Sequence, residues 1–154
     1  MSGRAPLLFR ALHAWFLVSR GLTLGVRGAV IDEADRVLLI RHTYVKGWHL
    51  PGGGVEIGET ALDALGRELR EEANIELTAP PVLRGICFNT RSSRRDHVLV
   101  YEVRAFRQTG PKRADREIAE AAFFDIEALP EGTTESTRTR LAEIQADAPV
   151  AVRW

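Results

Sequence analysis

Three glutamates in one helix-forming run, Glu68, Glu71 and Glu72, constrain this chain more than any other feature. At about 100° per residue, Glu71 and Glu72 lie roughly −60° and +40° from Glu68, so the three carboxylates share one helical face. Like charges at this spacing destabilise a helix. A hard divalent cation requires such oxygen ligands, because they neutralise its charge at fixed geometry. The cluster therefore predicts a metal-binding helix, against the alternative of a solvated acidic face in which Arg67 pairs with Glu71.

The residues that lead into these glutamates extend the pattern over a longer stretch, PGGGVEIGETALDALGRELREEANIEL, from 51 to 77. This stretch resembles the Nudix box, which reads Gly, five residues, Glu, seven residues, Arg-Glu, an aliphatic residue, any residue, Glu-Glu, any residue, Gly and an aliphatic residue. One position departs from the box: Asn74 stands where the last glycine would end the helix in a left-handed conformation, which asparagine also tolerates. The matching positions are Gly53, Glu59, Arg67, Glu68, Leu69, Glu71, Glu72 and Ile75.

The resemblance implies a hydrolase in which a box-bound Mg²⁺, or Mn²⁺, assists attack of water on a nucleoside diphosphate linked to another moiety. Glu68, Glu71 and Glu72 match the metal-binding and catalytic glutamates of the family, and either Glu68 or Glu72 could orient or deprotonate the water. Glu59 and Arg67 match the pair that locks the glycine loop to the helix, so both are expected to support the site. A bound cation would neutralise charge on the diphosphate and lower the pKa of a coordinated water.

Further site residues are expected outside the helix. Gly53 matches a glycine whose backbone carbonyl often serves as a metal ligand, and Gly52 and Gly54 are expected to let the backbone approach metal or phosphate closely. Many family members also use an acid from beyond the box. Glu117 is the first choice, because it precedes EAAFFDIEALP, which resembles the short strand and leucine-proline turn of the family. Glu120 is the second choice, and a solvent-exposed glutamate is the alternative for both.

Arginines are the candidate contacts for an anionic substrate. Arg27 and Arg41 lie in the first pair of predicted strands, where family members often contact the base or ribose. Arg91, Arg94 and Arg95 lie in a loop and could receive phosphate charge. A solvated surface position is the alternative for each of these arginines.

The sequence after the box bears on the substrate. Members that act on ADP-ribose or dinucleoside polyphosphates often carry a proline or tyrosine fifteen to seventeen residues past the box, where this chain has Thr90, Arg91 and Ser92. The absence of both the proline and the tyrosine favours nucleoside triphosphates or nucleotide sugars as substrates, with a 5′-phosphorylated RNA end as the alternative. The alternative function is a catalytically silent nucleotide-binding regulatory module, although such proteins usually lose a box acid and this chain keeps every one.

The order of apolar and turn residues predicts an α+β protein. The predicted elements are strands at 22–31, 37–41, 82–89, 97–106 and 121–125, an extended piece at 48–55, and helices at 59–73 and 134–146. The second strand is expected to form a hairpin with the first across a turn at 32–35. Leu62, Leu65, Leu69 and Ala73 are expected to face the core from the box helix. The resemblance sharpens this order to the Nudix α/β/α sandwich with a mixed sheet.

Residues 1–21 are expected to form an extra amphipathic helix ahead of a Nudix domain at 22–154. The residues at helical spacing are Leu7, Leu8, Ala11, Leu12, Trp15 and Phe16. Packing on the core or on a second subunit, which would give a homodimer, is the favoured role of this helix. An interfacial membrane helix is the alternative.

Composition limits the partners of the chain. Lys plus Arg and Asp plus Glu are balanced at 21 each, so no global field would attract a long nucleic acid. No stretch approaches the length of a membrane span, and the single cysteine, Cys87, excludes an intramolecular disulfide. Because the N-terminus lacks a signal-peptide pattern, a cytoplasmic protein with a small nucleotide-type substrate is expected.

Overall fold

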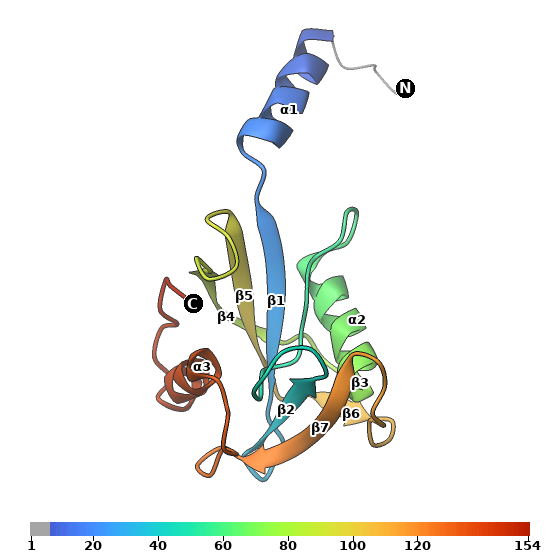
Figure 1. Cartoon of the computed structure of the whole chain (residues 1–154), viewed down its shortest axis with the longest axis vertical. Helices are drawn as coiled ribbons and strands as arrows, with labels where there is room; N and C mark the ends of the chain where they lie inside the picture. The colour runs from blue at the N-terminus through green and yellow to red at the C-terminus, as the bar shows by residue number, and fades with distance from the viewer. Residues whose placement is uncertain (1–6) are drawn as a thin grey trace.

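The computed structural model describes residues 7–154, and Figure 1 shows an α/β/α sandwich from which the first helix projects. The predicted fold class is confirmed. Residues 1–6 of the predicted N-terminal segment lie outside the described residues. The helices are α1 Leu7–Ser19, α2 Ala61–Ala73 and α3 Glu135–Gln145; the strands are β1 Thr23–Val30, β2 Arg36–His42, β3 Ile75–Leu77, β4 Val82–Phe88, β5 Asp96–Val103, β6 Phe106–Gln108 and β7 Ile118–Asp125.

The strands form a mixed sheet and two antiparallel pairs. β5 lies between β1, to which it is parallel, and β4, to which it is antiparallel. β2 pairs with β7, and β3 with β6. The predicted hairpin between the first two strands is therefore wrong: a single bridge, Ile31 to Val37, joins them. β1 ends in residues buried on both faces, as expected for a strand covered by layers on both sides. The turn at 32–35 then leads the chain into β2, which belongs to the β2–β7 pair.

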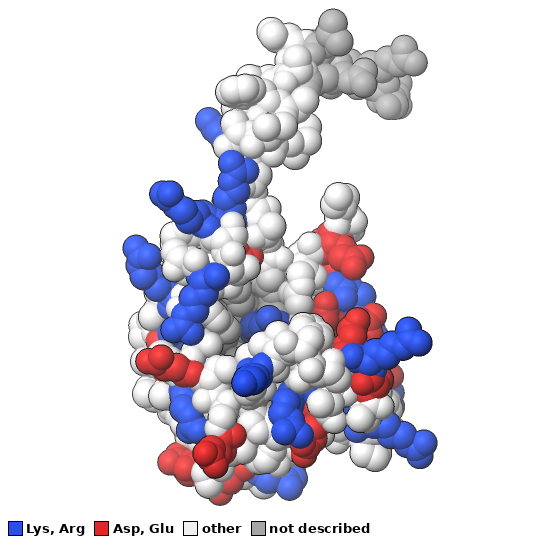
Figure 2. All heavy atoms as spheres, in the orientation of Figure 1, with Lys and Arg blue, Asp and Glu red and all other residues white. Residues whose placement is uncertain are grey.

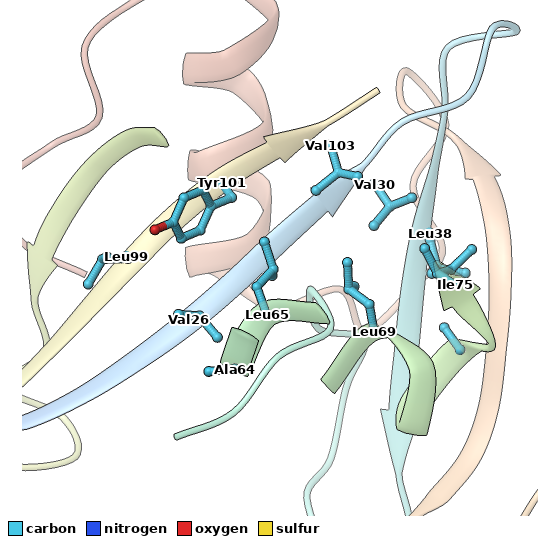
Figure 3. Close-up of a cluster of buried hydrophobic side chains, with 11 residues drawn as sticks. Val26, Val30, Leu38, Ala64, Leu65, Leu69, Ile75, Leu99, Tyr101 and Val103 are labelled. Atoms are coloured by element: carbon cyan, nitrogen blue, oxygen red, sulfur yellow. The ribbon is translucent and has the colours of Figure 1, made fainter. Parts of the chain in front are cut away.

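Two apolar clusters fill the two faces of the mixed sheet. In the cluster of Figure 3, Leu65 and Leu69 of α2 pack on side chains of β1 and β5. The other cluster lies beneath α3. Leu65, Leu69 and Ala73 are buried as predicted, whereas Leu62 is 45% exposed. Leu62 shares their helical face, but it lies in the first turn beside a surface groove that Glu59 also lines.

Both ends of α2 are capped. The Thr60 side chain accepts a hydrogen bond from the Asp63 backbone N–H at 3.1 Å, and the Asp63 carboxylate accepts one from the Thr60 N–H in return. Asn74 ends the helix in the left-handed region with φ of 56°. Its side-chain amide also donates to the carbonyls of Gly110 and Pro111. These two contacts explain why asparagine suits this position, because glycine could not make them.

Helix α1 does not pack on its own domain. Leu8, Trp15, Leu17 and Val18 are 64–80% exposed, and Figure 1 shows the helix extending away from the sheets. Of its two favoured roles, packing on the core is therefore wrong for the described residues of this helix, and contact with a second subunit stays a prediction. Within residues 7–154, no helix is both long enough and apolar enough to cross a membrane.

Candidate metal and diphosphate site

The glycine stretch before α2 is held against the helix by a buried carboxylate. The Gly52 N–H donates to Glu72 Oε2 at 2.7 Å, and Glu72 is 7% exposed. Gly52 has φ of 141°, and a Cβ there would lie 2.9 Å from the carbonyl carbon of Val26. Only glycine meets both requirements, positive φ and close approach to β1.

Glu72 carries the most informative electrostatic signal of the site. Burial raises the pKa of its carboxyl from 4.5 to about 7, against the opposing effects of the Gly52 N–H and of Arg27. Glu68 and Glu117 add to the rise because their negative charges disfavour ionisation of a third carboxyl. A carboxyl that titrates near neutrality inside a cleft suits either metal binding or proton transfer.

Gly53 lies directly against Glu68. A Cβ at this position would be 2.6 Å from Glu68 Cδ and 2.9 Å from Oε2, so any side chain here would displace the carboxylate. The Gly53 carbonyl, a predicted metal ligand, accepts a hydrogen bond from the Val26 N–H at 2.9 Å. Its second lone pair is the one that a metal could use.

Arg67 joins the glycine loop to the helix, as the family pattern implies. It forms a bidentate pair with Glu59, at 2.9 and 3.1 Å, and donates to the Gly54 carbonyl at 3.0 Å and to Glu68 at 2.7 Å. The hydrogen bonds from Arg67 and from a backbone N–H lower the pKa of Glu59. Glu71 lies 3.6 Å from Arg67, but its side chain is 62% exposed, so this carboxylate is available to solvent or ligand.

The predicted acids meet in one cleft of about 430 Å³. It is lined by Glu68, Glu71, Glu72, Asp115, Arg116, Glu117 and Ile118. Glu117, the first choice for an acid beyond the box, thus faces the box glutamates. Glu120 does not line this cleft and instead pairs with Arg41 at 2.9 Å. The geometry favours Glu117 over Glu120, whereas its chemical role stays a prediction.

The donor set of this cleft fits a hard divalent cation, because it consists of carboxylate oxygens with a single arginine among them. Within the described residues, no three acidic, histidine or cysteine side chains converge on a metal position as they stand. The reason is local: Glu68 is turned toward Arg67, and Glu71 is directed to solvent.

The candidate arginines lie in different environments. Arg27, on β1, donates to the Gly52 carbonyl and so holds the glycine loop against this strand. Burial lowers the pKa of its guanidinium, and the Glu72 and Glu68 carboxylates oppose that shift. Arg41 lies over the Trp48 ring at 5.4 Å in addition to its pair with Glu120.

The arginines of the β4–β5 loop lie outside the acidic cleft. Arg91, Arg94 and Arg95 do not line it, and Arg95 lies beside the carbonyls of Val18 and Gly21 at the end of α1. Their contact with substrate phosphates stays a prediction.

Two residues near the site were missed from the sequence. His42 Nε2 lies 3.9 Å from Glu72 Oε1, and burial lowers the pKa of its imidazole. Asp115 accepts hydrogen bonds from the backbone N–H groups of Glu117 and Ile118, at 2.9 and 2.8 Å, and shapes the turn that presents Glu117. An aspartate two residues ahead of a candidate acid is an Asx-turn signal that could have identified it. No comparable signal marks His42, because its approach to Glu72 is tertiary.

Comparison with known proteins agrees with this geometry. A NUDIX domain matches residues 21–144. The ADP-ribose pyrophosphatase of Methanocaldococcus jannaschii is 33% identical over 104 residues, which cover 66% of this chain and 61% of that protein. The human 8-oxo-dGDP phosphatase is 33% identical over 108 residues, which cover 68% of this chain and 33% of that protein. The crystal structure of a MutT Nudix hydrolase from Burkholderia pseudomallei superimposes with a TM-score of 0.67 at 26% identity and covers 79% of this chain and 97% of that one.

The domain match spans most of the chain and includes the whole box. The chain therefore belongs to the Nudix family. It spans 61% and 33% of the lengths of the two curated relatives, and their names point to different substrates.

Proposed function

We propose that this chain is a divalent-metal-dependent Nudix hydrolase that splits the diphosphate linkage of a nucleoside diphosphate linked to another moiety, by attack of water at phosphorus. The observation that carries the proposal is the meeting of Glu68, Glu71, Glu72 and Glu117 in one cleft beside the glycine loop. The names of the relatives, a pyrophosphatase and a phosphatase of nucleotide derivatives, support the same class of reaction.

Each residue has a distinct task in this reaction. Glu68, Glu71 and Glu72 would hold Mg²⁺ or Mn²⁺, which when bound neutralises diphosphate charge and acidifies a coordinated water. The Gly52 N–H and the support of its carbonyl by Arg27 keep the glycine loop close to Glu72. Arg67 fixes the loop to the helix through Glu59 and the Gly54 carbonyl. Glu117 faces the box glutamates and could orient or deprotonate water.

The experiment is product identification with a panel of nucleotides and Mg²⁺, comparing the wild type with Glu72→Gln and Glu117→Gln. Glu72→Gln should abolish turnover without unfolding the domain, because glutamine keeps the shape but loses the charge. Glu120→Gln is the matched control for Glu117→Gln, since Glu120 lies on β7, the strand that begins directly after Glu117, and does not line the cleft. Full activity of Glu72→Gln would refute the site. Tight nucleotide binding without any product would favour the silent regulatory module.

The panel also addresses the substrate. Nucleoside triphosphates and nucleotide sugars are the proposed classes, and ADP-ribose, 8-oxo-dGDP and 5′-phosphorylated RNA are the comparators. The products report both the cleaved bond and the group attached to the diphosphate.

A further inference from the structure

Helix α1 exposes apolar side chains on two opposite sides. Taking Leu8 as the origin, helical geometry places Trp15 at about −20°, Val18 at about −80° and Leu17 at about 180°. All four are 64–80% exposed. Contact with one protein surface would cover a single stripe of such a helix, whereas an apolar medium would cover every side.

The junction between α1 and β1 keeps the helix away from its own domain. Arg95 places a guanidinium nitrogen 3.5 Å from the Val18 carbonyl and 3.4 Å from the Gly21 carbonyl, and its own carbonyl accepts from the Thr23 N–H at 3.0 Å. A cation at this position also stabilises the C-terminal end of the helix dipole. With three residues between α1 and β1, the chain has little length in which to fold the helix back onto the sheets.

Positive charge predominates where α1 meets the domain (Figure 2). The first acidic residue of the sequence is Asp32, beyond β1. We define the basic collar as Arg20, Arg91, Arg94 and Arg95, four exposed arginines from the end of α1 and the β4–β5 loop. Figure 2 shows Lys and Arg gathered where the projecting helix meets the domain, with no Asp or Glu on the visible side of the helix.

Two acids lie near the collar. Glu135 lies 3.9 Å from Arg91, and Asp96 is engaged by Thr23 and Asn89 at 2.8 Å each. These two acids offset part of the positive charge of the collar. Among residues 7–154, Arg20 and Arg94 form no salt bridge with an acidic residue.

We propose that α1 and the basic collar bind the surface of an anionic lipid bilayer, with the helix buried in one leaflet and the arginines against the headgroups. The helix is about 20 Å long, shorter than the hydrocarbon thickness of about 30 Å, so it enters the membrane without crossing it. Apolar burial and attraction of arginines to anionic lipid together supply the binding that either alone provides only weakly. The inference is independent of the hydrolase activity.

The test is co-sedimentation of the full chain with vesicles of phosphatidylcholine alone and with vesicles of equal parts phosphatidylcholine and phosphatidylglycerol. Binding should be strong with the mixed vesicles and weak with the neutral ones. Trp15→Ser combined with Leu17→Ser should reduce binding at least about tenfold, whereas Val82→Ser, which alters an exposed apolar residue on β4, should leave it unchanged. Because these side chains are exposed, the fold should survive, which thermal unfolding would verify.

The role of the arginines is tested with Arg20→Glu and Arg94→Glu, each expected to weaken binding to the mixed vesicles about fivefold or more. The matched control is Arg113→Glu, an exposed arginine on the loop between β6 and β7. Equal binding to both kinds of vesicle, or binding that survives the helix and collar substitutions, would overturn the proposal. The absence of vesicle binding, together with a dimer that forms without lipid and is lost when Trp15→Ser is combined with Leu17→Ser, would instead assign the helix to a second copy of the chain.

Discussion

Gly53→Ala should separate catalysis from folding at this site. The new Cβ would move the Glu68 carboxyl carbon from 2.6 Å to at least the 3.4 Å of ordinary contact, a displacement of about 0.8 Å. Because Glu68 is a flexible side chain, it can yield with little effect on the fold. A displacement near 1 Å in a group that positions the reaction can lower the rate about 100-fold. We therefore expect about this loss in kcat, with a free energy of unfolding within about 1 kcal/mol of the wild type.

Gly52→Ala supplies the contrasting case. Its Cβ would meet the Val26 carbonyl and lie 3.0 Å from Arg27 Cα, and the φ of 141° is strained for alanine. The backbone of Val26 and Arg27 cannot move aside as the Glu68 side chain can, so Gly52→Ala should lower the free energy of unfolding more than Gly53→Ala does. Steady-state kinetics on the best substrate and urea unfolding of both variants make the comparison, with Gly110→Ala as a control because its Cβ would meet open space. Unchanged kcat in Gly53→Ala, or equal destabilisation of both variants, would refute the reasoning.

Three further measurements test the site and its supports. In metal-free protein, the contribution of Glu72 to the free energy of unfolding should decrease by on the order of 2–3 kcal/mol as pH rises from 4.5 to about 7, because folded Glu72 holds its proton longer than the unfolded chain does. Burial lowers the pKa of His42 and His49, which gives a slope of opposite sign in both proteins, so the effect is read as the difference between wild type and Glu72→Gln in urea unfolding across pH. Arg67→Lys keeps the charge but cannot bind Glu59, Glu68 and the Gly54 carbonyl at once, so kcat should fall about tenfold or more. Wild-type kinetics in this variant would contradict the role of Arg67 in holding the loop to the helix. Asn74→Ala should cost about 2 kcal/mol in thermal unfolding and Asn74→Gly less, since alanine loses both the left-handed tolerance and the amide contacts; an equal cost would show that φ is unimportant there.

The sequence predicted local structure best where short-range chemistry decides it. The left-handed end of α2 at Asn74 follows from residue type and position in the box, and it occurs. The brace between Glu59 and Arg67 followed from the family pattern, and it is present. The partner of β1 was mispredicted, because turn residues at 32–35 signal local pairing whereas β1 pairs with β5, more than sixty residues away. Strand partners depend on layers assembled from distant segments, which local patterns do not encode.

The spacing of Glu68, Glu71 and Glu72 determined that three carboxylates share one helical face, because helical geometry depends on sequence separation alone. The tertiary structure made them different from one another. Burial raises the pKa of Glu72 to about 7, whereas Glu71 stays exposed. The fold also brought Glu117 rather than Glu120 to the cleft, and it placed Arg95 beside the end of α1 and outside that cleft. Burial and long-range proximity exist only once distant segments are packed together, so these distinctions belong to the fold.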